Sequence, residues 1–268
     1  MQWSANGSHA VAGGGTAPGT WRFAESQLDY VGDARVGTVY VGGTKCDNRQ
    51  ISSTYTGWID LFGWGTSGYN SKYPYWTSSL DTVYGNGNAD ITGTNYDWGV
   101  YNAISNGGNI PGAWRTLTKN ELDYLVNTRP SGTVVNGTNN ARYTMATVDG
   151  IYGVVVFPDS AKIQMFDVQW ARINDTSNFG TVITAMQWYN LENMGCVFLP
   201  ASGQRFNTSV NLSGEYGAYW TSTVYNDTTA IQLHFAGIWA SYVVSSFHTP
   251  CNAHRHRGMS VRLVKEIR

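Results

Sequence analysis

The chain has 268 residues, which is long for one domain but within the range of a single loop-rich unit. Only 13% of the residues are charged and the formal net charge is -1, so the composition excludes an electrostatic attraction to nucleic acid or to an anionic membrane. Aromatic residues make up 14% of the chain, which excludes a disordered composition. No apolar run approaches the roughly 18 residues that a membrane-spanning helix needs.

The N-terminal part predicts one turn and one strand. Its first residues, MQWSAN, lack the charged and apolar regions of a signal peptide. Gly13, Gly14 and Gly15 predict a flexible turn rather than a phosphate-binding loop, because no strand-to-helix context surrounds them. Residues 21–24 are expected to form a short strand.

Three segments further along the chain predict helices. The first covers residues 97–104. The second begins at Thr118, which forms the pattern of a capping box with Glu121. The third begins at Thr184, and Gly195 stands where a left-handed residue would end it.

A glycine-led apolar strand that ends in proline follows each of the last two helices, at residues 153–158 and 195–200. This is a weak internal repeat, too degenerate for a solenoid. Further strands are expected at residues 219–223, 230–235, 239–245 and 259–264. The pattern predicts a single domain over residues 1–268 of the α+β class, with short antiparallel sheets, two or three helices and long loops.

Six sequence segments carry a family pattern. Three lie near the C-terminal end, GCVFLPASGQR at 195–205, GAYWTST at 217–223 and RGMSVRLV at 257–264. Three lie upstream, WRFAESQLDYVG at 21–32, WIDLFGWGT at 58–66 and WRTLTKNE at 114–121. Together they resemble the C-type-lectin-fold proteins of gut bacteria, a group that includes the variable proteins of diversity-generating retroelements. The resemblance covers the chain from Trp21 to Val264 and implies a C-type lectin-like fold.

The resemblance also implies a layout. The closing strand, at residues 259–264, would return to pair near the N-terminal strand. The segment between Trp220 and Arg257 would form the exposed surface that faces the ligand. In retroelement-diversified relatives this segment varies while the stretches on either side stay fixed. Thr221 stands where those relatives usually have serine, a small departure that leaves the layout unchanged.

Residues 224–256 also have the composition of a binding surface. Four of the five histidines of the chain lie in or at the end of this segment, among tyrosine, tryptophan, asparagine and serine residues that are typical of adaptable binding loops. The alternative is a hairpin and loop whose aromatic side chains only pack. The residues expected to contact a ligand are Tyr225, Asn226, Asp227, Thr228, Ile231, His234, Ile238, Trp239, Ser241, Tyr242, His248, Asn252, His254 and His256.

Neither a metal ion nor a cofactor is expected. His254 and His256 share one face of a strand and could be half of a metal site, but no carboxylate accompanies them at ligand spacing, and Cys251 is the nearest candidate. Two exposed histidines beside Arg255 are the favoured interpretation. The short stretches 249–252 and 226–227 only faintly resemble the calcium-binding tripeptides of sugar-binding lectins.

Catalysis is not expected either. Formylglycine-generating enzymes share the fold class and need a reactive cysteine pair, whereas Cys196 and Cys251 lack a cationic setting that would lower a thiol pKa. We therefore expect an adhesin-like or receptor-like protein, extracellular or on the cell surface, that binds an unknown protein or glycan on another cell or surface. The alternatives are a glycan-binding or pilus-tip adhesin of fixed specificity and, less favoured, an enzyme of the formylglycine-generating type.

Overall fold

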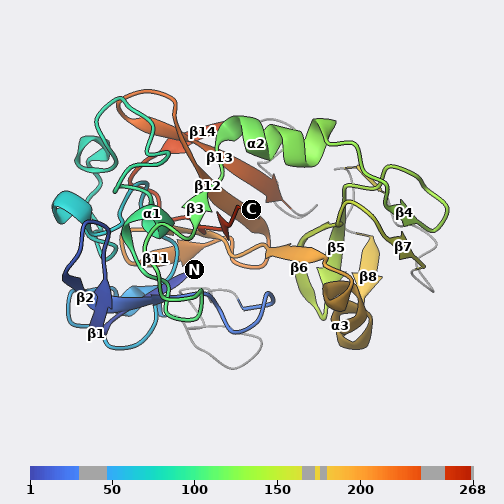
Figure 1. The fold of residues 1–268 in the computed structure, drawn as a ribbon, viewed down its shortest axis with the longest axis horizontal. Coiled ribbons are helices and arrows are strands. Elements are labelled where there is room, and N and C mark those ends of the chain that lie inside the picture. The colour runs from blue at the N-terminus through green and yellow to red at the C-terminus, as the bar shows by residue number, and fades with distance from the viewer. Residues whose placement is uncertain (30–46, 165–172, 176–179, 237–250, 267–268) are drawn as a thin grey trace.

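The computed structural model describes residues 1–29, 47–164, 173–175, 180–236 and 251–266 (Figure 1). The protein belongs to the α+β class, with several short sheets and few helices, as the sequence predicts. None of the helices within these ranges combines the length and the apolar character required to cross a membrane.

The helices are short. They are α1 (Trp98–Tyr101), α2 (Lys119–Asp123), which continues into the wider turn η4 (Tyr124–Thr128), and α3 (Ala185–Asn193). Three single 3₁₀ turns complete the helical elements of the described residues, η1 (Asn48–Gln50), η2 (Tyr69–Ser71) and η3 (Asp81–Val83).

Two helices begin at the predicted residues, Thr118 and Thr184, and each start is a capping box. Thr118 accepts a hydrogen bond from the backbone of Glu121, whose carboxylate accepts one from the backbone of Thr118. Thr184 and Gln187 do the same at the start of α3. Gly195 has a φ of +91° just after α3, so the predicted end of this helix is also confirmed.

The helix predicted over residues 97–104 is shorter than expected. Only Trp98–Tyr101 are helical, after a cap by Asp97. Asn102 turns to an extended conformation and donates hydrogen bonds to the carbonyls of Ser67 and Trp98. Residues 102–104 then bridge to the N-terminal hairpin, because buried contacts there outweigh helix propensity.

The first part of the molecule, on the left in Figure 1, holds the chain ends and most of the strands. The N-terminal hairpin pairs β1 (Gln2–Ala10) with β2 (Thr16–Arg22) around the predicted glycine turn. A second pair joins β3 (Arg115–Thr116) to β15 (Leu263–Val264), and a third joins β10 (Gln204–Phe206) to β11 (Ser209–Asn211). The sheet that matters for the site has the order β12 (Tyr216–Val224), β13 (Thr229–Ala236), β14 (Cys251–His254).

The second part, on the right in Figure 1, is built around a four-stranded sheet with α3 beside it. The sheet contains β5 (Tyr143–Val148), β6 (Ile151–Val156), β8 (Thr181–Ile183) and β9 (Val197–Pro200), in the order β8-β5-β6-β9. A small parallel pair, β4 (Val134–Val135) and β7 (Lys162–Ile163), lies beyond it. The two glycine-led segments of the weak sequence repeat are therefore β6 and β9, which pair directly with each other.

Apolar side chains of the two parts share a core. One cluster belongs to the first part and a second to the four-stranded sheet with α3. A third cluster contains Met145 and Val154 from the four-stranded sheet together with Tyr219, Leu233 and Phe235 from β12 and β13. Burial across this contact joins the two sheets through one continuous set of side chains.

The closing segment differs from the prediction. Only Leu263–Val264 form a strand, and their partner is β3 rather than the N-terminal strand. Upstream of β15, Met259 bridges to Phe62 instead. The chain start is nevertheless adjacent, since the amino group of Met1 lies 3.2 Å from the carbonyl oxygen of Val261. The strand predicted at residues 239–245 lies outside the described residues.

Candidate ligand-binding site

Arg255 joins three segments at one end of the first part. Its side chain is fully buried, and the guanidinium lies 4.7 Å from the centroid of the Trp64 ring. It donates hydrogen bonds to the carbonyls of Gly87 at 2.7 Å and Tyr84 at 3.4 Å. Another goes to the carbonyl of Asn226. Arg255 therefore fixes the loop after η3 and the turn between β12 and β13 against the residues that follow β14.

The turn between β12 and β13 is ordered by one side chain. The Oδ1 atom of Asn226 accepts hydrogen bonds from the backbone amides of Thr228 at 3.0 Å and Thr229 at 2.8 Å. It also accepts from both threonine hydroxyls. Such an asparagine turn fixes the backbone locally. Tyr225 and Asp227, the neighbours of Asn226, consequently project from a defined backbone.

Apart from Ile231, the predicted contact residues fall into three groups. The exposed ones are Tyr225, Asp227, Asn252 and His254, with Tyr225 at 60% exposure. The half-buried ones are Asn226, Thr228, His234 and His256. Ile238, Trp239, Ser241, Tyr242 and His248 lie outside the described residues.

Ile231 does not belong to an exposed surface. It is only 5% exposed, because it lies on the same face of β13 as Leu233 and Phe235, which are also buried. Strand alternation is present as predicted, with Leu233 and Phe235 in the core shared by the two parts and Ala230 in the core of the first part. The same alternation assigns Ile231 to the apolar face, so the prediction that it contacts a ligand is wrong.

Asp81 lies between two of the predicted histidines. Its Oδ2 atom is 2.8 Å from Nδ1 of His254, and its Oδ1 atom is 2.8 Å from Nδ1 of His256. The backbone amide of His256 donates to the same Oδ1 atom at 3.1 Å. Burial opposes ionisation of Asp81, but the His256 amide and the two imidazoles outweigh it and lower the pKa of this carboxyl. The sequence analysis missed Asp81 because 173 residues separate it from His254.

Cys251 contacts another histidine of the predicted set, His234. Its Sγ atom lies 2.7 Å from Nδ1 of His234 and accepts a hydrogen bond from Gln232 at 3.2 Å. Burial raises the pKa of the Cys251 thiol and lowers the pKa of His234. Both shifts favour the neutral pair, whereas a nucleophilic thiolate beside an imidazolium needs the opposite.

The other described cysteine, Cys196, lies in the core of the second part. Burial raises the pKa of its thiol to about 12. Cys196 and Cys251 are both free thiols. Neither has the environment of an activated nucleophile.

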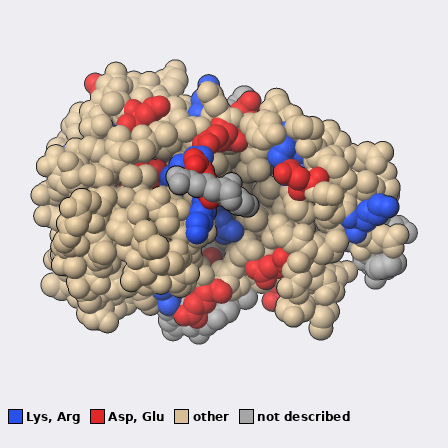
Figure 2. Space-filling model, in the orientation of Figure 1, with Lys and Arg blue, Asp and Glu red and all other residues tan. Residues whose placement is uncertain are grey.

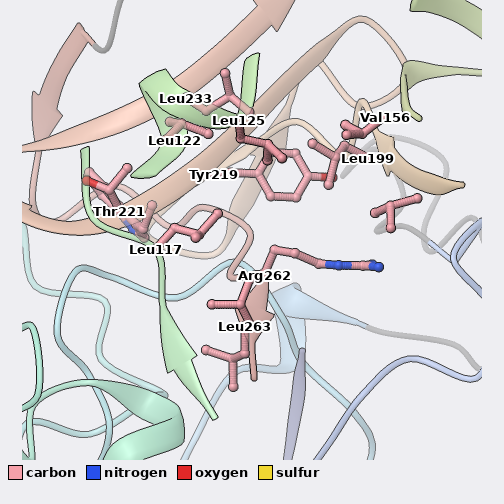
Figure 3. A pocket seen from close by; sticks show the side chains of 13 residues that line it. Leu117, Leu122, Leu125, Val156, Leu199, Tyr219, Thr221, Leu233, Arg262 and Leu263 are labelled. Carbon is pink, nitrogen blue, oxygen red and sulfur yellow. The ribbon is translucent and has the colours of Figure 1, made fainter. Parts of the chain in front are cut away.

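A separate apolar pocket of about 270 Å³ lies where the two sheets meet (Figure 3). Leucines from α2 and its surroundings line it, together with Tyr219, and Arg262 lies at one side with its guanidinium pointing away from them. Arg262 donates a hydrogen bond to Gln27 at 2.9 Å. None of the predicted contact residues that the structure describes lines this pocket.

The face shown in Figure 2 is mostly uncharged. Basic and acidic side chains gather near its middle and lie close to one another, so this face has no extended region of one charge.

One comparison with known proteins gave a match. A family model described as a domain of unknown function (DUF8237) matches residues 152–264. It covers part of the chain. The matched residues run from β6 to β15, so they include strands from both parts of the molecule and the whole predicted binding segment. Comparison with curated proteins and with solved structures gave no match.

Proposed function

We propose that this protein is a ligand-binding protein that presents a recognition surface on a C-type lectin-like scaffold. The observation that carries the proposal is the arrangement around Arg255. Tyr225, Asp227 and His254 are exposed, while the backbone beneath them is held by the buried guanidinium and by the Asn226 turn. A fixed frame under exposed aromatic and polar side chains lowers the entropic cost of binding and tolerates substitution.

The scaffold part of the proposal rests on three features. Capping boxes begin α2 and α3, the chain start lies against the closing segment, and the segment between Trp220 and Arg257 returns to one end of a three-stranded sheet. The nearness of the chain start to the closing segment supports the layout that the sequence resemblance implies, although the closing strand pairs with β3 rather than with the N-terminal strand. The same resemblance leads us to propose an exported protein whose binding segment is diversified by a retroelement. A reverse transcriptase gene and a near-copy of the 3′ coding segment in the neighbouring DNA would test diversification.

The ligand is expected to be a protein or a glycan on another cell or surface. Protein and glycan arrays probed with the chain would identify a ligand. The dissociation constant for that ligand is then measured for the parent chain and for each variant. Tyr225→Ala combined with Asn252→Ala should weaken binding at least about tenfold, equivalent to about 1.4 kcal/mol. Tyr189→Ala is the matched control, because Tyr189 is a tyrosine of 63% exposure on α3 in the second part. Equal affinity of the double variant and the parent chain would place the ligand elsewhere.

Two other functions compete with this proposal. An adhesin of fixed specificity would use the same surface, so only the absence of a retroelement template distinguishes it. An enzyme of the formylglycine-generating type needs an activated cysteine. The raised thiol pKa values of Cys196 and Cys251 argue against it.

A further inference from the structure

Three side chains with metal-binding atoms converge at the edge of the proposed surface. Asp81 comes from η3, and His254 and His256 come from the end of β14 and the residues after it. The carboxylate and the two imidazoles each offer one ligand atom, and these atoms lie within 4.8 Å of one another. The 2.8 Å contacts from Asp81 to both Nδ1 atoms show that the histidines turn toward the carboxylate rather than toward solvent.

The backbone beneath the cluster is fixed before any ion binds. His254 pairs with Thr229 at the end of the β13–β14 ladder. The amide of His256 donates a hydrogen bond to Asp81. Arg255, which stands between the two histidines, is buried and donates to the carbonyl of Gly87. Preorganised ligands lose little conformational freedom when a metal ion binds.

The spacing of the ligand atoms suits a small first-row ion. Ligand atoms about 2.0–2.1 Å from a tetrahedral Zn²⁺ ion lie roughly 3.3 Å from each other. The 2.8 Å contacts between Asp81 and each Nδ1 atom would open by about 0.5 Å, and the remaining pair of ligand atoms, which lies within 4.8 Å, would close by up to about 1.5 Å. The three side chains are at least partly exposed, so they have room for this movement. The ion would replace the protons that now lie between each nitrogen and the carboxylate.

The donor types select the class of metal ion. Two imidazoles and one carboxylate suit Zn²⁺ and neighbouring divalent transition metals, whereas Ca²⁺ and Mg²⁺ prefer oxygen donors alone. Three protein ligands leave one position of a tetrahedral ion open. The side chain of His254 is 51% exposed, so this position is accessible from solvent.

We propose that Asp81, His254 and His256 form a binding site for a divalent transition-metal ion of the Zn²⁺ class. The site joins η3 to the end of β14 and leaves one coordination position for water or for a donor atom of a bound partner. The site is independent of the proposed function, because the three ligands bind the ion without any other molecule.

Titration of the full chain with Zn²⁺ alone tests the site by calorimetry. The expected result is one Zn²⁺ ion per chain and a higher melting temperature in its presence. Asp81→Asn and His254→Ala should each weaken binding by more than the roughly 10–100-fold that changes around a metal site usually cause. Asp81→Asn keeps the shape of the side chain, and His254 is largely exposed, so circular dichroism should show that both variants fold.

Two control variants separate this site from other zinc-binding groups. Cys251→Ser should bind Zn²⁺ with unchanged affinity, which excludes the neighbouring pair of Cys251 and His234. Glu215→Gln removes one exposed negative charge away from the cluster and should also leave the affinity unchanged. Unchanged Zn²⁺ binding in both Asp81→Asn and His254→Ala, or no binding by the parent chain, would overturn the proposal. Neither result depends on the array experiment, so the two proposals fail separately.

Discussion

Single residues decide how the proposed surface is held. Arg255 stands between two histidines in the sequence and looks like part of a polar, exposed run, yet its side chain is fully buried. Its fork of donors reaches the carbonyls of Tyr84, Gly87 and Asn226 at once. A lysine carries the same charge but cannot reach several acceptors in a plane.

The first residue-scale prediction follows from this geometry. Arg255→Lys should lower the free energy of unfolding by about 2–4 kcal/mol, because hydrogen bonds of a buried charge are lost and their carbonyl partners are left unpaired. Urea denaturation measures the change. Arg49→Lys is the control, since Arg49 is exposed and pairs with Asp47, two residues away, and it should change stability by less than about 0.5 kcal/mol. Equal effects of the two substitutions would show that Arg255 is not an anchor.

At the scale of elements, the two capped helices offer a natural comparison. Both begin with a threonine and a partner three residues later, but the partner is Glu121 in α2 and Gln187 in α3. Glu121 also accepts hydrogen bonds from both terminal guanidinium nitrogens of Arg115 in β3, at 2.6 Å and 2.8 Å. Hydrogen bonding to Arg115, above all, lowers the pKa of Glu121 to about 2.

This shift has a defined sign. A carboxyl whose pKa is lower in the folded chain stabilises it fully above its usual value of 4.5, and the stabilisation is lost as the pH falls toward 2. Glu121→Gln should therefore lower stability by about 1 kcal/mol at pH 7, a small value because the pair is partly exposed, and by progressively less as the pH falls from 4.5 through 2. The measurement is the difference in unfolding free energy between the two proteins across this range.

Taking the difference in unfolding free energy between the variant and the parent chain cancels the contributions of other titrating groups. Burial raises the pKa of Asp97 to about 6, but this group is present in both proteins and its contribution cancels. Glutamine can still complete the capping box, as Gln187 does in α3, so the helix itself should persist. A destabilisation that is independent of pH would show that the charge of Glu121 contributes nothing.

At the scale of the whole molecule, the shared core decides whether the two parts unfold together. Met145 is 1% exposed and lies in β5, in the cluster that also contains Tyr219 and Phe235 of the other sheet. Side chains that are buried only when both sheets are present couple the folding of the two parts.

Met145→Ala should lower the free energy of unfolding by about 2–5 kcal/mol through the loss of buried atoms and the cavity left behind. Transitions followed by far-ultraviolet circular dichroism and by tryptophan fluorescence should coincide before and after the substitution, because both parts contain tryptophans and strands. A transition that splits into two steps in the parent chain would contradict a shared core.

The sequence by itself determined the local features. The capping boxes at Thr118 and Thr184, the glycine after α3, the alternation in β13 and the α+β class depend on residues within a few positions of each other, so their patterns are visible in the chain. The exposure of Tyr225, Asn252 and His254 also agrees with the predicted binding segment.

Only the tertiary structure decided which distant groups meet. It placed Asp81 against His254 and His256, brought His234 to Cys251, buried Ile231 and paired β15 with β3. These contacts depend on how sheets and loops pack across more than a hundred residues in some cases, and no local pattern encodes that geometry. The polar and aromatic side chains of the predicted binding segment are therefore visible in the sequence, whereas the distant residues that they contact follow from the packing of the chain.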